Sequence, residues 1–122
     1  MTRILLYIED SQDNVRLVGR ILRQRPGITL RSAPTGQDGV RAAIEERPGL
    51  ILLDNRLPDA TGAEVLRQLR NSEQTAAIPV LIVSGDTAAE TIEKFREAGA
   101  AGFIGKPFDI HDFLSEIDKY LT

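Results

Sequence analysis

Short, mainly apolar runs alternate with longer amphipathic segments along this chain, and this alternation limits its fold more than any other feature. Runs of this kind are typical of strands that are buried on both faces of a parallel sheet. The segments between them repeat apolar residues at helical spacing. The pattern predicts an α/β fold, a doubly wound five-stranded parallel sheet within a three-layer sandwich, with right-handed crossovers. The predicted strands cover residues 4–8, 28–31, 50–53, 80–83 and 101–105.

The amphipathic segments carry helix signals at their ends. Thr61 and Glu64 have the T-x-x-E spacing of a capping box, and Thr87 and Glu90 repeat it. The last segment has apolar residues at i, i+3, i+4, i+7 and i+11, which predicts a helix with one buried stripe. The residues of this stripe are Ile110, Phe113, Leu114, Ile117 and Leu121.

The size and charge of the chain exclude several classes of protein. Its 122 residues are suited to one domain, predicted over residues 1–122. The sequence contains no apolar run near the ~20 residues that cross a bilayer, so we expect no membrane span. A net charge of −3 argues against direct nucleic-acid binding. The absence of cysteine and of a secretory signal at the N-terminus is compatible with a reducing cytoplasm, where we expect the protein.

Four of the predicted strands end in polar residues that suit one phosphate-and-metal site. Glu9 and Asp10 follow the first strand, Asp54 the third, Ser84 the fourth and Lys106 the fifth. In an open parallel sheet, ligands bind outside the carboxyl ends of the strands, so we expect these side chains to converge. The second strand ends without such a residue. This favours a position at the sheet edge and a strand order of 2-1-3-4-5.

The three acids predict a metal site. Glu9, Asp10 and Asp54 would repel one another strongly in one pocket unless a cation were present. Carboxylate oxygens are the ligands that Mg²⁺ prefers. The alternative for each acid taken singly is a solvated loop carboxylate.

The segment 54–62, with the sequence DNRLPDATG, completes a pattern that resembles a known family. Together with Glu9-Asp10, Ser84 and Lys106-Pro107, it resembles the receiver domain of two-component response regulators over essentially the whole chain. The resemblance implies a flavodoxin-like fold and a function in two-component signal transduction. Asp54 would accept a phosphoryl group from a histidine kinase or a phosphotransfer protein in a magnesium-dependent reaction. The chain would then not be an enzyme, because it would promote only its own phosphorylation and dephosphorylation.

The resemblance also assigns roles in the phosphorylation site. The metal ligands would be Glu9, Asp10, Asp54 and the backbone carbonyl of Arg56. Lys106 would neutralise the phosphoryl oxygens, and the peptide bond before Pro107 would be cis, as X-Pro bonds allow.

Two further residues would switch with phosphorylation. Ser84 resembles the switch hydroxyl that binds the phosphoryl group, and Phe103 resembles the switch aromatic that turns inward with it. Taken alone, Ser84 would be a local turn cap and Phe103 a core residue.

The resemblance places partners on two surfaces. The helix 11–25 would dock the kinase or phosphotransfer protein, with Gln12, Asn14 and Arg16 as candidate contacts. The face Thr87–Thr122 would contact a downstream protein, covalently linked kinase domains or a second copy in a homodimer. Whether the chain is a stand-alone receiver or part of a hybrid kinase stays open.

Three further hypotheses concern the site. Arg56 and Asp86 are candidates for an ion pair that crosses the site mouth and slows dephosphorylation, the alternative being two solvated side chains. A pseudo-receiver would keep the fold as an interaction module without being phosphorylated. A flavin-binding electron carrier would need a phosphate-cradling loop after the first strand, where Glu9 and Asp10 would repel the flavin phosphate.

Overall fold

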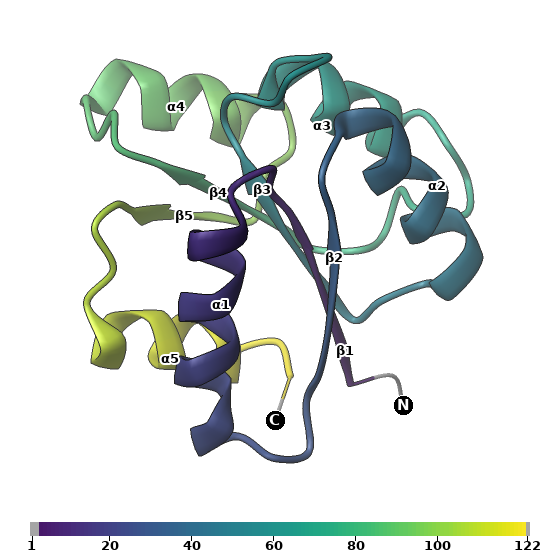
Figure 1. The fold of residues 1–122 in the computed structure, drawn as a ribbon. Coiled ribbons are helices and arrows are strands. Elements are labelled where there is room, and N and C mark those ends of the chain that lie inside the picture. Colours follow the sequence, from purple (N-terminus) through teal and green to yellow (C-terminus); the bar gives the residue numbers. More distant parts are fainter. Residues whose placement is uncertain (1–2, 122) are drawn as a thin grey trace.

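The computed structural model describes residues 3–121 and confirms the predicted three-layer α/β architecture (Figure 1). These residues form a five-stranded sheet in which every pair of neighbours is parallel, in the order β2-β1-β3-β4-β5. The predicted order and the edge position of β2 are therefore confirmed. The strands are β1 Ile4–Ile8, β2 Thr29–Ala33, β3 Leu50–Asp54, β4 Val80–Ser84 and β5 Gly102–Gly105.

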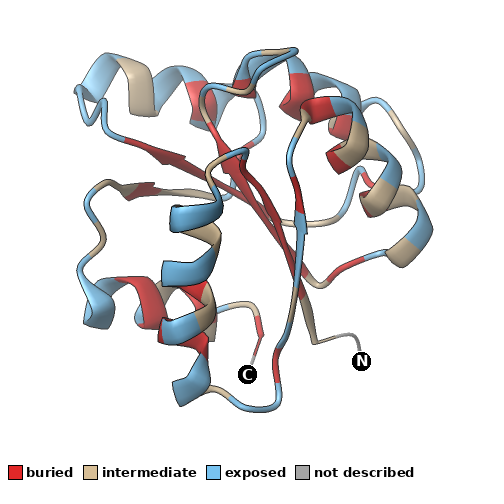
Figure 2. Cartoon of the chain, in the orientation of Figure 1, coloured by how far each residue is buried: buried red, intermediate tan, exposed pale blue. Residues whose placement is uncertain are grey.

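Helices cover both faces of the sheet, and alternate strand residues point to one face or the other. Leu5 and Tyr7 of β1 belong to the core beneath α1 and α5, whereas Leu6 and Ile8 belong to the core beneath α2, α3 and α4. Figure 2 shows the buried residues concentrated in the central strands and on the inner faces of the helices. The helices are α1 Gln12–Ile21, α2 Gly36–Glu46, α3 Gly62–Arg70, α4 Ala89–Glu97 and α5 Ile110–Asp118, and a short 3-10 helix, η1 Leu22–Gln24, follows α1.

The two predicted capping boxes have different outcomes. At α3 the box is confirmed, since the Thr61 hydroxyl accepts the Glu64 N–H and the Glu64 carboxylate accepts the Thr61 N–H, each at 3.2 Å. At α4 it is wrong, because the N-cap is Ala88 and no side chain caps the helix. Asp86 stabilises this turn instead, accepting the Ala88 N–H at 3.0 Å.

Two other predictions needed correction. Ile110 is 46% exposed, although the other four residues of the predicted stripe are buried. It is the first residue of α5, next to the loop that follows β5, and lies outside the core cluster beneath the helix. The second strand begins at Thr29 rather than at Ile28, which is buried just before it.

No helix within residues 3–121 is long and apolar enough to span a membrane. Met1, Thr2 and Thr122, which the predicted domain and the predicted partner face include, lie outside the described residues.

Candidate functional site

The polar residues that follow four of the strands meet at the carboxyl edge of the sheet. Strand register explains this, because Asp54 pairs with Val83 and Ser84 pairs with Gly105, directly before Lys106. The Lys106 ammonium lies 2.7 Å from Oδ1 of Asp54 and 3.2 Å from Oε1 of Glu9. The structure therefore brings residues from three strand ends into direct contact.

The three acids form the predicted cluster. One carboxylate oxygen each from Glu9, Asp10 and Asp54 lies within 4.8 Å of the others. Glu9 and Asp54 are buried, whereas Asp10 is exposed to solvent. Hard oxygen donors at this spacing fit the ligand preference of Mg²⁺.

Burial shapes the charge of this cluster. Burial raises the pKa of Asp54, and the nearby Glu9 carboxylate raises it further, so that the Lys106 hydrogen bond only partly offsets the shift. Burial lowers the pKa of Lys106. Its hydrogen bond to Asp54 and the charges of both acids outweigh this effect, so its pKa lies above the ordinary value. Two carboxylates thus share one ammonium, and a divalent cation would relieve the remaining repulsion.

Glu9 is the most enclosed acid of the site, with 2% of its surface exposed. Its Oε1 accepts hydrogen bonds from the Tyr7 hydroxyl at 3.0 Å and from Nδ2 of Asn14 at 2.9 Å. Burial alone would raise the pKa of Glu9, but the hydrogen bond from Asn14, the Lys106 ammonium and the Tyr7 hydroxyl hold it below the ordinary value. Glu9 is therefore held as a carboxylate.

A cleft of about 340 Å³ opens beside Asp54. Ser84 is 5% exposed at its wall, and its Oγ accepts the Asp86 N–H at 3.0 Å. This bond leaves the hydroxyl hydrogen of Ser84 available to donate. The cleft is lined by Asp54, Asn55, Arg56, Ser84, Gly85, Asp86 and Lys106.

Arg56 and Asp86 do not form the predicted ion pair. The Asp86 carboxylate bonds instead to the start of α4, where it accepts hydrogen bonds from the Ala88 N–H and the Thr91 hydroxyl, each at 3.0 Å. These two hydrogen bonds lower the pKa of Asp86, and the charge of Arg56 contributes least. Arg56 instead contacts the site through its backbone, whose N–H donates to Oδ2 of Asp54 at 3.3 Å.

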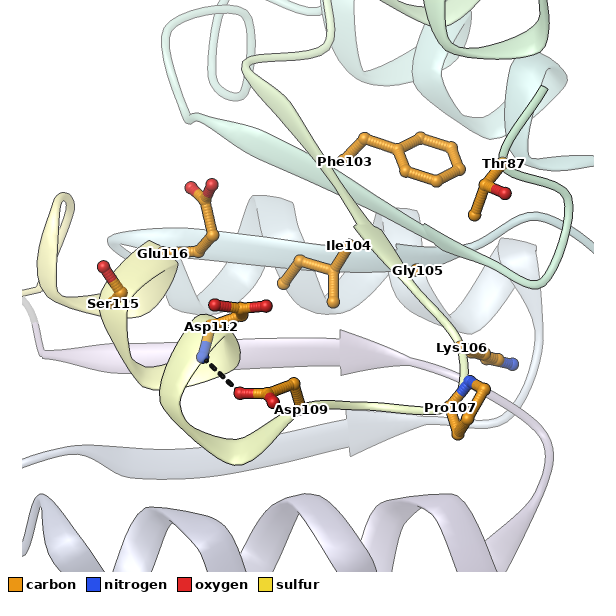
Figure 3. A pocket seen from close by; sticks show the side chains of 10 residues that line it. All are labelled: Thr87, Phe103, Ile104, Gly105, Lys106, Pro107, Asp109, Asp112, Ser115 and Glu116. Carbon is orange, nitrogen blue, oxygen red and sulfur yellow. Dashed lines mark hydrogen bonds between the residues drawn. The ribbon is translucent and has the colours of Figure 1, made fainter. Parts of the chain in front are cut away.

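Ser84 and Phe103 lie on the same side of the sheet. Ile82, two residues before Ser84, belongs to the core beneath α2, α3 and α4, and Phe103 packs against that core. Phe103 is half-buried and lines a second cavity, of about 480 Å³, beside Thr87 (Figure 3). Lys106 and Pro107 lie at the other end of this cavity, and the peptide bond between them is cis, as expected.

Sequence reasoning missed three residues that support the site. Tyr7 was not singled out, although its position two residues before Glu9 on a strand places both side chains on one face. Asn14 was predicted only as a candidate contact for a partner, and its hydrogen bond to Glu9 was not foreseen. Asp59 joins the loop after β3 to α2, accepting the N–H groups of Gly36 at 2.8 Å and Gln37 at 3.0 Å. No sequence signal indicated that contact.

The fold and the acid cluster with its lysine define a class of signalling domain, and comparison with known proteins agrees. The sequence profile of the response regulator receiver domain matches residues 5–118. The chain therefore belongs to the response regulator receiver family and is a receiver domain of two-component signalling.

Individual relatives cover nearly the whole chain. The polar-differentiation response regulator DivK of Brucella ovis is 31% identical over 99% of this chain and 98% of its own length. The chemotaxis response regulator CheY4 of Vibrio cholerae superimposes with a TM-score of 0.89 at 26% identity, over 99% of this chain and 100% of the other. The receiver domain of a sensor histidine kinase from Pseudomonas aeruginosa, solved with a magnesium ion coordinated in its active site cleft, has a TM-score of 0.87 at 24% identity, over 99% and 98% of the two chains.

Proposed function

We propose that this receiver accepts a phosphoryl group on Asp54 from a phosphohistidine of a histidine kinase or a phosphotransfer protein. The observation that carries the proposal is the contact of 2.7 Å between the Lys106 ammonium and Oδ1 of Asp54 inside the acid cluster. A carboxylate oxygen of Asp54 forms the new bond to phosphorus while the bond from phosphorus to the histidine nitrogen breaks. The electron pair of the broken bond stays on the imidazole, which takes up a proton.

Asp10, Asp54, the backbone carbonyl of Arg56 and Glu9, directly or through water, would hold Mg²⁺. When bound, the ion supplies charge neutralisation for the phosphoryl oxygens. The donor set supports this assignment, because three carboxylate oxygens lie within 4.8 Å of one another. The magnesium ion of the Pseudomonas aeruginosa receiver domain also favours it.

Lys106, Ser84 and Phe103 would couple the chemistry to a change of surface. The Lys106 ammonium pairs with charge that spreads over the phosphoryl oxygens in a loose transition state. The Ser84 hydroxyl donates to a phosphoryl oxygen, and its hydrogen bond from the Asp86 N–H breaks as it moves. Phe103, on the same side of the sheet, follows that movement. Phosphorylation thereby shifts an existing equilibrium toward the form that a downstream partner binds through residues 87–121.

The first helix, with Gln12, Asn14 and Arg16, remains the proposed surface for the phosphate donor. Arg16 is exposed and pairs with Asp13 at 3.0 Å, and Asn14 also donates to Glu9. Beside these residues, an apolar groove of about 370 Å³ runs from α1 to the loop after β5, lined by Asn14, Leu17, Lys106, Pro107 and Phe108. Two large apolar side chains are exposed in this region. Leu17 in the groove is 38% exposed, and Ile110, two residues after Phe108, is 46% exposed. This groove ends at Lys106 and suits an apolar helix that carries the phosphohistidine.

The proposal is tested by incubating the protein with Mg²⁺ and acetyl phosphate and measuring intact mass. A labile phosphoryl adduct is expected on the parent and on Asp13→Asn, which removes an exposed acid outside the acid cluster. None is expected on Asp54→Asn or without Mg²⁺. An unmodified parent would reject phosphoacceptor function in favour of a pseudo-receiver, and an equal adduct on Asp54→Asn would reject Asp54 as the acceptor.

A further inference from the structure

The two carboxylate oxygens of Glu9 have different surroundings. Oε1 accepts from the Tyr7 hydroxyl at 3.0 Å, from Nδ2 of Asn14 at 2.9 Å and from the Lys106 ammonium at 3.2 Å. Oε2 accepts only the longer bond from the Ser11 N–H, at 3.4 Å, within the described residues. A carboxylate offers about four lone-pair sites over its two oxygens, so three donors saturate Oε1. The remaining acceptor capacity of Glu9 is on Oε2.

We propose that Tyr7 and Asn14 are positioning residues for magnesium binding, which hold Oε1 of Glu9 so that Oε2 faces the cation or one of its waters. The inference rests on the magnesium-dependent function proposed above. It adds two residues that touch neither the metal nor the phosphoryl group and act through Glu9.

Both donors are fixed by their own structural elements. Tyr7 is fully buried in β1, and the core beneath α1 and α5 holds its ring. Its hydroxyl donates to Glu9 from the side of that core. Asn14 lies in the first turn of α1, where its backbone N–H donates to the Ser11 hydroxyl at 3.3 Å. Oε1 of Glu9 is therefore held from a strand and from a helix at the same time.

The hydrogen bonds from Tyr7 and Asn14 would help the buried Glu9 carboxylate to bind a cation. A buried carboxylate is unfavourable unless its oxygens receive hydrogen bonds, and a ligand that must first reorient binds a cation less tightly. Hydrogen-bond partners of ligating carboxylates and histidines typically change metal affinity by about 10- to 100-fold when they are removed. Tyr7 and Asn14 belong to this class of partner.

The test measures the dissociation constant of Mg²⁺ by isothermal titration calorimetry. Tyr7→Phe keeps the buried ring and removes only the hydroxyl, and Asn14→Ala removes the second donor. We expect each to weaken Mg²⁺ binding about tenfold. Tyr120→Phe removes the hydroxyl of the half-buried tyrosine just after α5 and should leave the affinity unchanged. Urea unfolding monitored by circular dichroism checks that each variant is folded.

A double-mutant cycle separates positioning from a general structural effect. In a Glu9→Gln background, Tyr7→Phe and Asn14→Ala should weaken Mg²⁺ binding no further, because the group through which they act is gone. Unchanged affinity in both single variants would overturn the inference while leaving the proposed function intact. A full tenfold loss in the Glu9→Gln background would also overturn it. If the parent does not bind Mg²⁺, the proposed function fails, and the inference with it.

Discussion

Helix α2 lies directly on the side chain of Ile8 at Gly39. A β-carbon added to Gly39 would lie 2.5 Å from Cδ1 of Ile8, which is fully buried in β1. Ile8 is the last residue of β1 and immediately precedes Glu9. The packing of α2 against β1 is therefore closer than an alanine allows.

Gly39→Ala is expected to destabilise the fold, although alanine is the better helix former. Overpacking costs about 1–3 kcal/mol, which outweighs a gain in helix propensity of about 1 kcal/mol. Gly19→Ala in α1 is the matched control, because its β-carbon would meet only Cδ2 of Leu30 at 3.8 Å. The control should be stabilised by roughly 0.5–1 kcal/mol. Urea unfolding measures both, and equal stabilisation of the two variants would contradict the close contact.

Asp54→Asn should stabilise the protein in the absence of metal. The pKa of Asp54 is raised in the folded state, first by burial and then by Glu9. Its ionised form is consequently less favourable in the folded chain than in the unfolded chain at neutral pH, and this penalty disappears as the pH falls through the raised pKa. In EDTA at pH 7 the variant should have the higher melting temperature.

Magnesium should make the parent melt at a higher temperature than Asp54→Asn. Binding to the folded state alone stabilises it by about 2.7 kcal/mol at a hundredfold excess over the dissociation constant. The melting temperature of the parent should rise with Mg²⁺, and that of Asp54→Asn should change little. Parallel shifts in both proteins would show that the ion binds elsewhere.

Lys106→Met should separate metal binding from phosphoryl transfer. The ammonium pairs with Asp54 and Glu9, so a cation that uses the same carboxylates meets its repulsion. Its removal should strengthen Mg²⁺ binding several-fold and slow phosphorylation by acetyl phosphate on the order of a hundredfold, as for other charge-stabilising donors. Lys119→Met, which removes an exposed lysine paired with Glu116, should change neither quantity. Weaker Mg²⁺ binding in Lys106→Met would mean that the lysine organises the acids rather than competing with the ion.

The fold and the convergence of the polar strand-end residues could be predicted because they depend on local patterns. Strands β3 and β4 are buried along their whole length, so their sequences are continuous apolar runs. The polar residue at the end of each, Asp54 or Ser84, then marks the carboxyl edge of the sheet. Parallel strand order and register bring these ends together without any further signal.

The supporting contacts depend on three-dimensional placement and left weaker traces in the sequence. The T-x-x-E spacing of Thr87 and Glu90 could not show that Asp86 would take the Ala88 N–H and start α4 differently. The same bond explains the wrong prediction for Asp86 and Arg56, because opposite charges on two loops do not reveal which partner is closer. Ile110 matched the helical period but lies at the end of its helix, beyond the core.

Asp86 should be coupled to Thr91 and not to Arg56 in its effect on phosphoryl lifetime. The Thr91 hydroxyl donates to the Asp86 carboxylate at 3.0 Å, and the Asp86 N–H donates to the Ser84 hydroxyl at 3.0 Å. Double-mutant cycles on the rate of dephosphorylation test this. Asp86→Ala and Thr91→Val should be clearly non-additive, whereas Asp86→Ala and Arg56→Ala should add within about 0.3–0.5 kcal/mol. Strong coupling between Asp86 and Arg56 would instead support an ion pair between them across the mouth of the site.

Asp59 should make the stability of the fold depend on pH in the acidic range. The N–H groups of Gly36 and Gln37 lower its pKa in the folded state. A lowered pKa means that Asp59 contributes stability above its unfolded pKa, about 3.9, and that this contribution is lost as the pH falls through the folded value. Asp59→Asn should therefore be less stable than the parent at pH 5–8, and the difference should shrink below about pH 4.

Urea unfolding at a series of pH values measures this difference. Asp13→Asn is the control for removing one negative charge, because its side chain is 93% exposed in the first turn of α1. The control should show a smaller stability difference, since Asp13 accepts from a side chain on its own helix and not from the first amides of another element. A difference between parent and Asp59→Asn that stays constant down to pH 2 would mean that the carboxylate charge is not what joins the Asp54 loop to α2.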